Sequence, residues 1–419
     1  METTKRKFIN FSLVESNKYL FTDSQFNIID KIFIVIYLFL SCFETYMPSV
    51  ISGSTKYIML AVCFLLLIKD IFRRNLIIRW HIVLMVLWLA LKLLSVFWGG
   101  YNDIVSLHFI SQFGFVLLFV AFGLRDYSEK DKQFFVYSIL LTTFLFSLLS
   151  IIFQAPYNGI YVSRRVLTLF GKQLDPNNCA AFETICFAIS IYFTLFKKKY
   201  IFCIPVIVSG VACLLSGSRA GLLAVVLIFI VAVLLFPLKG KWSLLIKIFS
   251  LLVLGAIVFL LCLFILPPET FKRLFLEGYI SSGGGERDNY WKLAFDMFAN
   301  KPIFGHGWGT ASYFGKAQSE AVHNTFLAMM AENGIVGLGL FVSYPIFCLA
   351  SGIKNKNYLI ILLFIAFFVP AFFIDSINKR FIWNILFVFL TLSTKNIKPI
   401  FEHNKRTYNE KVQYYRIDI

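Results

Sequence analysis

Charged residues are scarce in this sequence, and the usual cysteine signatures are missing. Only 15% of the 419 residues are charged while 58% are hydrophobic, whereas ordinary soluble domains carry roughly 25% charged residues. This balance excludes a soluble globular domain. The eight cysteines form no CxxC pair and no Cys/His ligand spacing, so neither a disulfide framework nor a metal site is predicted. The glycine run at 283–285 lacks the Gly-Lys-Ser/Thr ending of a P-loop.

Apolar runs, by contrast, recur along nearly the whole chain. Such runs are able to cross a hydrocarbon core of about 30 Å, which makes the chain a polytopic membrane protein. We therefore predict an all-α fold of about twelve transmembrane helices, with a long external loop between spans 9 and 10. The predicted spans are 29–47, 56–69, 81–98, 107–124, 134–154, 177–195, 200–216, 220–237, 246–267, 334–352, 357–374 and 381–394.

Basic residues predict the orientation of these spans. The net charge is +17, and most of the lysines and arginines fall in short loops and tails on one side, which the positive-inside rule makes cytoplasmic. Anionic lipid headgroups, and not nucleic acid, are the expected partners of such membrane-hugging charge. The opposite, external side receives two longer segments and a turn that contains Asp375, Lys379 and Arg380.

The chain then divides into a membrane domain with two tails. Residues 1–28 form a polar cytoplasmic tail without a signal-peptide pattern, so the first span is expected to act as the targeting signal. Residues 29–394 form the integral membrane domain, with external segments at about 155–176 and 268–322. Residues 395–419 form a basic cytoplasmic tail. We expect the inner membrane of a bacterium as the location, with the active site on the external face.

The first external segment combines cations with a helix-start signal. Arg164, Arg165 and Lys172 lie on it, and guanidinium and ammonium groups bind phosphate or sugar hydroxyls. Asp175 opens an Asp-Pro-Asn-Asn sequence directly before a span. This sequence predicts a capped helix start, with Asn177 or Asn178 as the cap.

A tight external turn, Ser216–Gly221, brings Arg219 to the start of the eighth span. Its glycines allow a close approach of backbone to a ligand or a neighbouring helix. Two interpretations stay open: Arg219 anchors the span in the headgroups, or it lies packed and buried near a ligand.

The second external segment contains Arg287, Trp291 and a Gly-His-Gly-Trp-Gly turn with Trp308 at its fourth position. Residues 291–299 predict a short amphipathic helix. Sugars stack on aromatic faces such as these, but Trp291 and Trp308 are equally consistent with the aromatic belt at a membrane interface.

A short helix is predicted from His323 to Asn333, followed by Gly334 as its end. Its length of about eleven residues, or about 16 Å, is too short to span a membrane. It is expected to lie slanted in the outer leaflet, with His323 at its start near the external arginines. Glu332, Glu183 and Lys92 lie in or near apolar spans, where a structural ion pair and a catalytic role are both open.

These motifs together resemble the bacterial O-antigen polymerases and O-antigen ligases. The matching residues cover about 155–345, and the first four spans match by topology alone. They are Ser218–Gly221, Arg287 with Trp291, Pro302–Gly309, His323-Asn324 and Glu332–Gly334, together with the arginine-rich segment that ends in Asp175-Pro176-Asn177.

The resemblance implies a glycosyltransferase that uses undecaprenyl diphosphate-linked glycans, with Arg219, Arg287 and His323 in donor binding or catalysis. Arginines in a partly dry site stabilise the leaving diphosphate. The expected transfer is inverting and needs no metal and no cofactor, since the chain has no Asp-x-Asp pair. His323 is the hypothetical base or acceptor-positioning group. Arg164, Arg165, Lys172, Asp175, Trp308 and Glu332 are weaker candidates for substrate binding.

Three functions are compared on this basis. A polymerase of O-antigen or capsule repeat units is favoured, because Arg164 and Arg165 offer a second basic surface for a second lipid-linked substrate. A ligase that transfers the glycan to lipid A-core is the alternative. A transporter of lipid-linked oligosaccharides is the third, although paired broken helices are not visible. A chain-length regulator is a possible partner.

Overall fold

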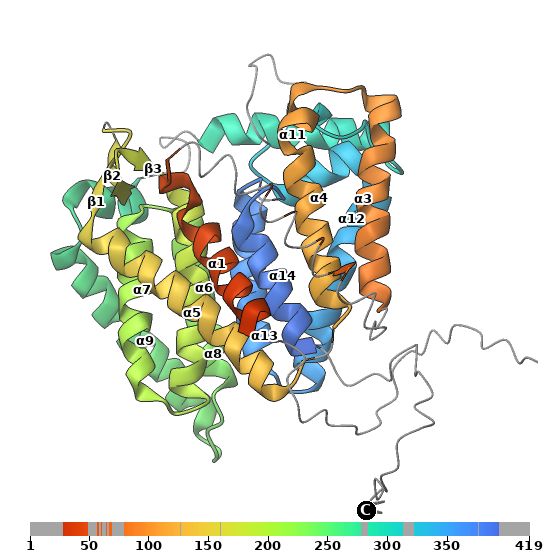
Figure 1. Ribbon diagram of the computed structural model, residues 1–419. Helices are drawn as coiled ribbons and strands as arrows, with labels where there is room; N and C mark the ends of the chain where they lie inside the picture. The colour runs from red at the N-terminus through yellow and green to blue at the C-terminus, as the bar shows by residue number, and fades with distance from the viewer. Residues whose placement is uncertain are drawn as a thin grey trace, which may run out of the picture.

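The computed structural model describes residues 28–48, 79–125, 127–159, 161–277, 284–312, 322–375 and 377–393, with isolated positions between 57 and 68. These residues form a bundle of roughly upright helices with a small sheet at one end (Figure 1). Six of the described helices are long and apolar enough to cross a membrane. The chain is thus an integral membrane protein with a predominantly α-helical fold, as predicted.

All but one of the predicted spans coincide with a helix. The second, 56–69, lies outside the described residues apart from isolated positions. The others correspond to α1 (Ile28–Phe43), α3 (Trp80–Gly99), α4 (Asp103–Gly123), α5 (Glu129–Ile152), α6 (Pro176–Leu195), α7 (Cys203–Leu215), α8 (Arg219–Leu235), α9 (Ser243–Ile265), α12 (Thr325–Lys354), α13 (Tyr358–Phe373) and α14 (Arg380–Ser393). Short 3₁₀ turns lie at Glu44–Tyr46, Tyr200–Phe202 and Thr310–Ser312.

Helix α6 is the centre of the bundle. Its most apolar stretch is 83% buried, against 6% for the more apolar α9. Helix α6 packs against α5, α7, α8 and α13, whereas α9 turns nearly all its side chains outward. An exposed face of that kind is stable only in contact with lipid, so the difference separates the core of the bundle from its periphery.

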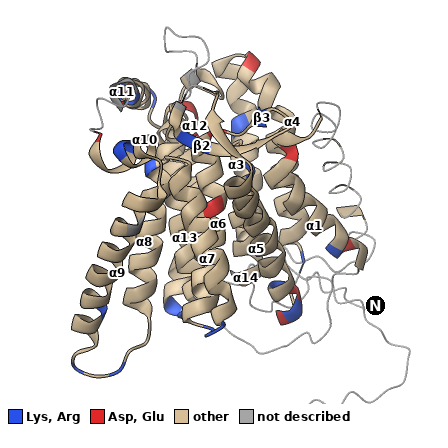
Figure 2. Cartoon of the chain, turned by 90° about the vertical axis from the view of Figure 1, so that its left-hand side faces the viewer, with Lys and Arg blue, Asp and Glu red and all other residues tan. Residues whose placement is uncertain are grey.

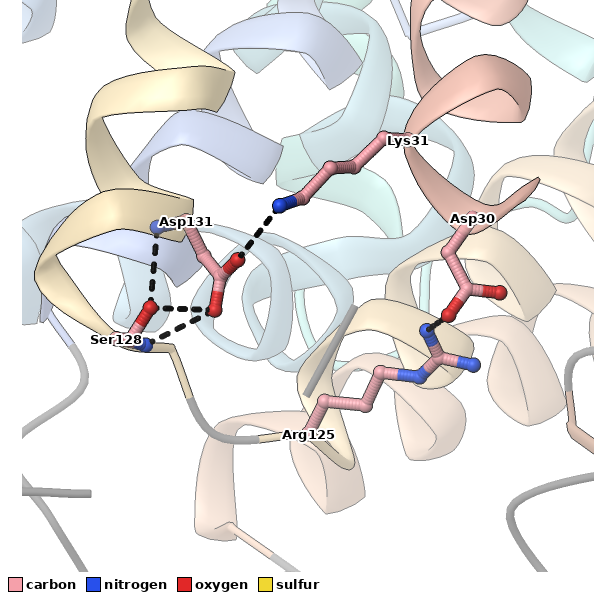
Figure 3. A network of polar contacts seen from close by, with 5 residues as sticks. All are labelled: Asp30, Lys31, Arg125, Ser128 and Asp131. Carbon is pink, nitrogen blue, oxygen red and sulfur yellow. Dashed lines mark hydrogen bonds and ion pairs between the residues drawn. The ribbon is translucent and has the colours of Figure 1, made fainter. Parts of the chain in front are cut away.

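A polar network joins α1 to α5 at the end of the bundle opposite the sheet (Figure 3). The Arg125 guanidinium lies 3.2 Å from the Asp30 carboxylate, and both are buried. Lys31 lies 3.7 Å from Asp131, which also closes a capping box with Ser128 at the start of α5. Charged residues lie mostly toward the two ends of the bundle (Figure 2), as expected when the middle of each helix meets hydrocarbon.

The segment predicted as an external loop, 155–176, contains a three-stranded antiparallel sheet. Its strands are β1 (Gln154–Tyr157), β2 (Tyr161–Leu169) and β3 (Lys172–Gln173), in that order. Phe170 and Gly171 both have positive φ, at 52° and 71°, which is the backbone of a tight two-residue hairpin turn. An external segment was predicted here from the sequence, without any prediction of strands; β-branched residues and turn residues close a local ladder in it.

Three further elements lie near this end of the molecule (Figure 1). Helix α10 (Pro268–Phe271) continues into a π-helical turn, η3 (Lys272–Leu276), and packs against β2. Helix α11 (Gly284–Asn300) crosses the end of the bundle and packs against α12. These elements bring the two long segments between spans to the same end.

Helix α12 is two helices joined at a break. Gly334 has φ of 65° and ψ of −168°, outside any helical conformation. The first part begins at Thr325 and ends at this glycine, which confirms the predicted end of a short helix at Asn333-Gly334. The second part, up to Lys354, is the predicted tenth span.

Candidate functional site

The backbone at the break in α12 is completed by the segment Pro302–Gly309. A helix that ends inside a protein leaves carbonyl and amide groups without partners. Here the His306 amide donates to the Ala331 carbonyl at 2.9 Å, and the Gly307 amide donates to the Glu332 carbonyl at 2.8 Å. The Ile335 amide donates to the Pro302 carbonyl at 2.8 Å. The segment therefore holds the end of the short helix in place.

Glycines make this contact possible. A Cβ on Gly305 would lie 2.4 Å from the Glu332 carbonyl carbon, and one on Gly307 would lie 2.5 Å from Gly99 Cα. Both glycines have positive φ, at 69° and 109°. The Gly-His-Gly-Trp-Gly sequence is thus a packing motif that seats one backbone directly on another.

Trp308 lies inside this packing. It is 1% exposed, its amide donates to Ser95 Oγ at 2.9 Å, and the Lys92 ammonium lies 4.6 Å from its ring centre. The ring of Phe109 stacks near it at 6.5 Å. Trp308 therefore belongs to the wall of a cavity, and its contact with a sugar stays a prediction.

His323 lies directly before the short helix in a backbone conformation that few residues adopt. Its φ is +53°, in the left-handed region, where histidine occurs more often than most residues but still seldom. The next residue, Asn324, is the helix cap: its Oδ1 accepts hydrogen bonds from the amides of Phe326 and Leu327, both at 3.0 Å. Unusual backbone conformations concentrate at functional sites.

Helix α11 contacts the chain next to His323. Trp291 Nε1 donates to the Val322 carbonyl at 3.1 Å, and the Trp291 ring packs edge-on against Phe372 at 5.7 Å. Arg287 lies one turn earlier on α11 and is half-buried. One rigid helix therefore carries Arg287 and fixes the backbone beside His323.

A cavity of about 380 Å³ opens beside the short helix. Its size is in the range of small-molecule sites. Four predicted site residues line it: Asp175, Trp308, His323 and Glu332. Lys92 lines it as well. Polar residues that were not predicted as site residues also line it: His108, Gln112, Asp375, Asn378 and Lys379.

Asp375 is the most informative of these additions. It lies between α13 and α14, where the Thr325 hydroxyl donates to the neighbouring Ile374 carbonyl at 2.7 Å. Burial raises the pKa of the Asp375 carboxyl, while Lys92, Lys379 and His323 act in the opposite direction. The turn that contains Asp375 was predicted to be external. The charge of Asp375 was the one signal in the sequence that could have indicated a role for it.

Arg219 and Arg273 form a reciprocal pair of backbone contacts. The Arg219 guanidinium donates to the Arg273 carbonyl through Nε at 3.1 Å and Nη2 at 2.8 Å, and to the Glu277 carbonyl through Nη2 at 2.8 Å. Arg273 Nε donates to the Gly217 carbonyl at 3.1 Å. Arg219 is thus packed against η3 and is half-buried, and its position near a ligand stays a prediction.

At Gly217, this turn contacts strand β2 closely. The φ of Gly217 is +62°, and a Cβ there would lie 2.4 Å from the Ser163 carbonyl oxygen, 3.2 Å from Arg164 Cγ and 3.4 Å from Arg273 Cδ. The turn between α7 and α8 therefore touches β2 on one side and η3 on the other, and a side chain at position 217 would separate them.

Four arginines from four segments gather around this turn: Arg164, Arg219, Arg273 and Arg287. Burial and the charges of the other three arginines lower the pKa of Arg273 to about 10, with Glu277 acting against them. Like charges that are held together in this way favour an anion between them. We call these four residues the arginine cluster.

Asn177 links the arginine cluster to the cavity. Ser218 Oγ, in the turn before Arg219, donates to Asn177 Oδ1 at 2.9 Å, and Asn177 lines the cavity. The cap of α6 is Asp175, whose Oδ1 accepts from the amides of Asn177 and Asn178 at 2.9 and 3.3 Å. The prediction of an asparagine cap was wrong, because Pro176 occupies the first helical position and leaves Asp175 as the cap.

The remaining candidates lie apart from the described lining of the cavity. Arg165 pairs with Pro156 in the sheet, and the Lys172 ammonium donates to the Met47 carbonyl near the end of α1. Glu183 is buried in the middle of α6.

Comparison with known proteins agrees with the resemblance seen in the sequence. Residues 204–342 match the O-antigen ligase family, which covers about a third of the chain. The matched region contains Arg219, Arg273, Arg287 and His323 and ends shortly after the break in α12. No curated protein matches the chain. The matched region of this bundle of membrane helices is therefore similar to the O-antigen ligase family of proteins.

Proposed function

We propose that the protein is a glycosyltransferase that moves a glycan from undecaprenyl diphosphate to a lipid-linked repeat unit, as a polymerase of O-antigen or capsule. The reaction takes place at the outer face of a bacterial cytoplasmic membrane, with both termini on the cytoplasmic side. One observation carries this proposal: the arginine cluster lies next to a cavity that His323 lines, and Asn177 connects the two.

The arginine cluster suits the leaving group of this transfer. When the sugar leaves the lipid diphosphate, negative charge develops on the phosphate oxygens. Guanidinium groups in a partly buried site stabilise that charge, and preorganised donors of this kind contribute a large share of catalysis. Arg287 belongs to the cluster and lies in the first turns of helix α11.

The cavity suits the acceptor. A hydroxyl that attacks the anomeric carbon has to lose its proton, and histidine, present in the lining as His323 and His108, has the ordinary pKa closest to neutrality. In this proposal His323 accepts that proton or positions the hydroxyl, and the nearby Asp375 carboxylate stabilises the imidazolium that forms.

A ligase that transfers the glycan to lipid A-core is the second candidate. The matched family is described as O-antigen ligase, and Arg164 belongs to the arginine cluster, which weakens the case for a separate basic surface on β2. The preference for a polymerase then rests on Arg165 and Lys172 alone. No finding supports the transporter.

Reconstitution tests both candidates. Purified protein in liposomes would receive an undecaprenyl diphosphate-linked repeat unit, with and without lipid A-core, and products would be separated by electrophoresis. A ladder on the lipid carrier that Arg287→Ala abolishes supports the polymerase. Transfer only in the presence of lipid A-core supports the ligase, and the absence of transfer under both conditions contradicts the proposal.

A further inference from the structure

The guanidinium of Arg219 donates several hydrogen bonds to backbone carbonyls of the protein. Two of its nitrogens donate to backbone carbonyls of Arg273 and Glu277. A guanidinium presents five N–H donors in a fixed fork, and three bonds to one short segment orient that fork toward η3. The geometry is that of a residue that holds another segment in place.

The segment that Arg219 holds is the one that carries Arg273. Among the described residues, Arg273 makes one side-chain hydrogen bond, from Nε to the Gly217 carbonyl, so its two terminal nitrogens have no hydrogen-bond partner there. The side chain is only partly exposed. Half-buried guanidinium nitrogens usually find acceptors, and an anion with several oxygens supplies them.

The surroundings of Arg273 point to the same ligand. Arg164, Arg219 and Arg287 all repel it, and its pKa is lowered to about 10 by burial and by these charges. A diphosphate between the four residues replaces this repulsion with attraction. A purely structural tie would need no such concentration of like charge.

We propose that Arg273 binds a phosphate group of the lipid diphosphate donor through its terminal nitrogens, and that Arg219 acts as a positioning residue that holds Arg273 in place. This inference rests on the proposed function. It gives Arg273 a direct contact with the donor, and it assigns Arg219 a role through Arg273 in place of direct contact.

The test measures binding of undecaprenyl diphosphate to the full-length protein in detergent. Arg273→Gln is expected to weaken binding by about tenfold to hundredfold, the usual effect of losing hydrogen bonds to a charged group. Lys272→Gln is the matched control, since Lys272 is the exposed neighbour in η3 and carries the same charge. Its binding should equal that of the wild type. Arg273→Lys retains the charge without the fork and should give an intermediate loss; it also replaces Arg273→Gln if that variant does not fold.

A double-mutant cycle tests the positioning role. Arg219→Gln should weaken binding in the wild type and have little further effect when Arg273 is already glutamine. Equal losses in both backgrounds would overturn the assignment of Arg219. Arg287→Ala serves as the benchmark: if it weakens binding while Arg273→Gln does not, Arg273 is not a ligand and the proposed function stands. If neither variant weakens binding, the proposed function fails as well.

Discussion

Trp291 donates a 3.1 Å hydrogen bond from its indole nitrogen to the carbonyl of Val322, the residue before His323. This contact couples two parts of the site that lie far apart in the sequence, because α11 also carries Arg287. The same helix therefore carries the Arg287 guanidinium and contacts the backbone beside the His323 imidazole. A change in the contact should affect the chemical step more than the binding of the donor.

Replacement of Trp291 by phenylalanine tests this coupling. The variant keeps an aromatic ring against Phe372 and loses the hydrogen bond, so the backbone beside His323 is less tightly fixed. We expect kcat to fall by about tenfold to hundredfold, because small displacements of reacting groups slow the chemical step by this much. The affinity for undecaprenyl diphosphate should be unchanged. Phe295→Leu on the outer face of α11, where Phe295 is 57% exposed, should leave both quantities at wild-type values. Parallel losses of kcat and affinity in Trp291→Phe would contradict a specific role at His323.

The break in α12 gives a prediction about stability. An alanine at Gly334 would have its Cβ 2.2 Å from the Ile303 carbonyl oxygen, at a φ of +65°. We expect the variant to lose about 2 kcal/mol or more of unfolding free energy, since strain and steric overlap add. Thermal unfolding in detergent measures the change. Gly339→Ala, five residues later, is the matched control: nothing lies within 4 Å of its Cβ position, so the melting temperature should stay the same or rise.

Much of this fold follows from local signals in the sequence. Hydrophobic runs locate the helices because each helix in a membrane has to satisfy its own backbone hydrogen bonds. The end of the short helix at Asn333-Gly334 was likewise predictable, since few residues other than glycine adopt the conformation of Gly334. These features depend on one residue or on one continuous segment.

Arg273 and Asp375 show what the sequence could not reveal. Each is a single charged residue in a connecting segment, where charge is ordinary. Their surroundings become unusual only when segments distant in sequence meet: Arg164 from β2 beside Arg273, and Lys92 from α3 beside Asp375. The role of Gly217 was hidden for the same reason, since its close contacts are with Ser163 and Arg273.

His323 can be tested without altering the backbone around it. Asparagine tolerates positive φ about as well as histidine does, so His323→Asn removes the imidazole while keeping the conformation before Asn324. If His323 is the base, we expect kcat to fall by about a hundredfold or more with donor affinity and melting temperature retained. His323→Gly relieves any backbone strain, and it should be at least as stable as the wild type and equally inactive. Full activity in either variant would exclude His323 as the base.

Asp375 should make stability depend on pH. Burial raises the pKa of its carboxyl above the unfolded value of 3.8, so the fold favours the protonated form. The stability associated with that form is fully present below pH 3.8 and is lost as the pH rises through the higher pKa of the folded protein. Asp375→Asn mimics the protonated state at every pH. We therefore expect this variant to melt at a higher temperature than the wild type near neutrality.

The same comparison across pH separates this effect from a general improvement in packing. The difference in melting temperature between Asp375→Asn and the wild type should shrink toward zero as the pH falls to about 4, near the ordinary pKa of an aspartate. In a Lys92→Met background the difference should widen at neutral pH, because Lys92 is one of the cations that oppose the rise in the Asp375 pKa. A constant difference at every pH would show that titration of Asp375 is not its cause. A wild type that melts higher than Asp375→Asn at neutral pH would mean that the cations around the carboxylate outweigh its burial.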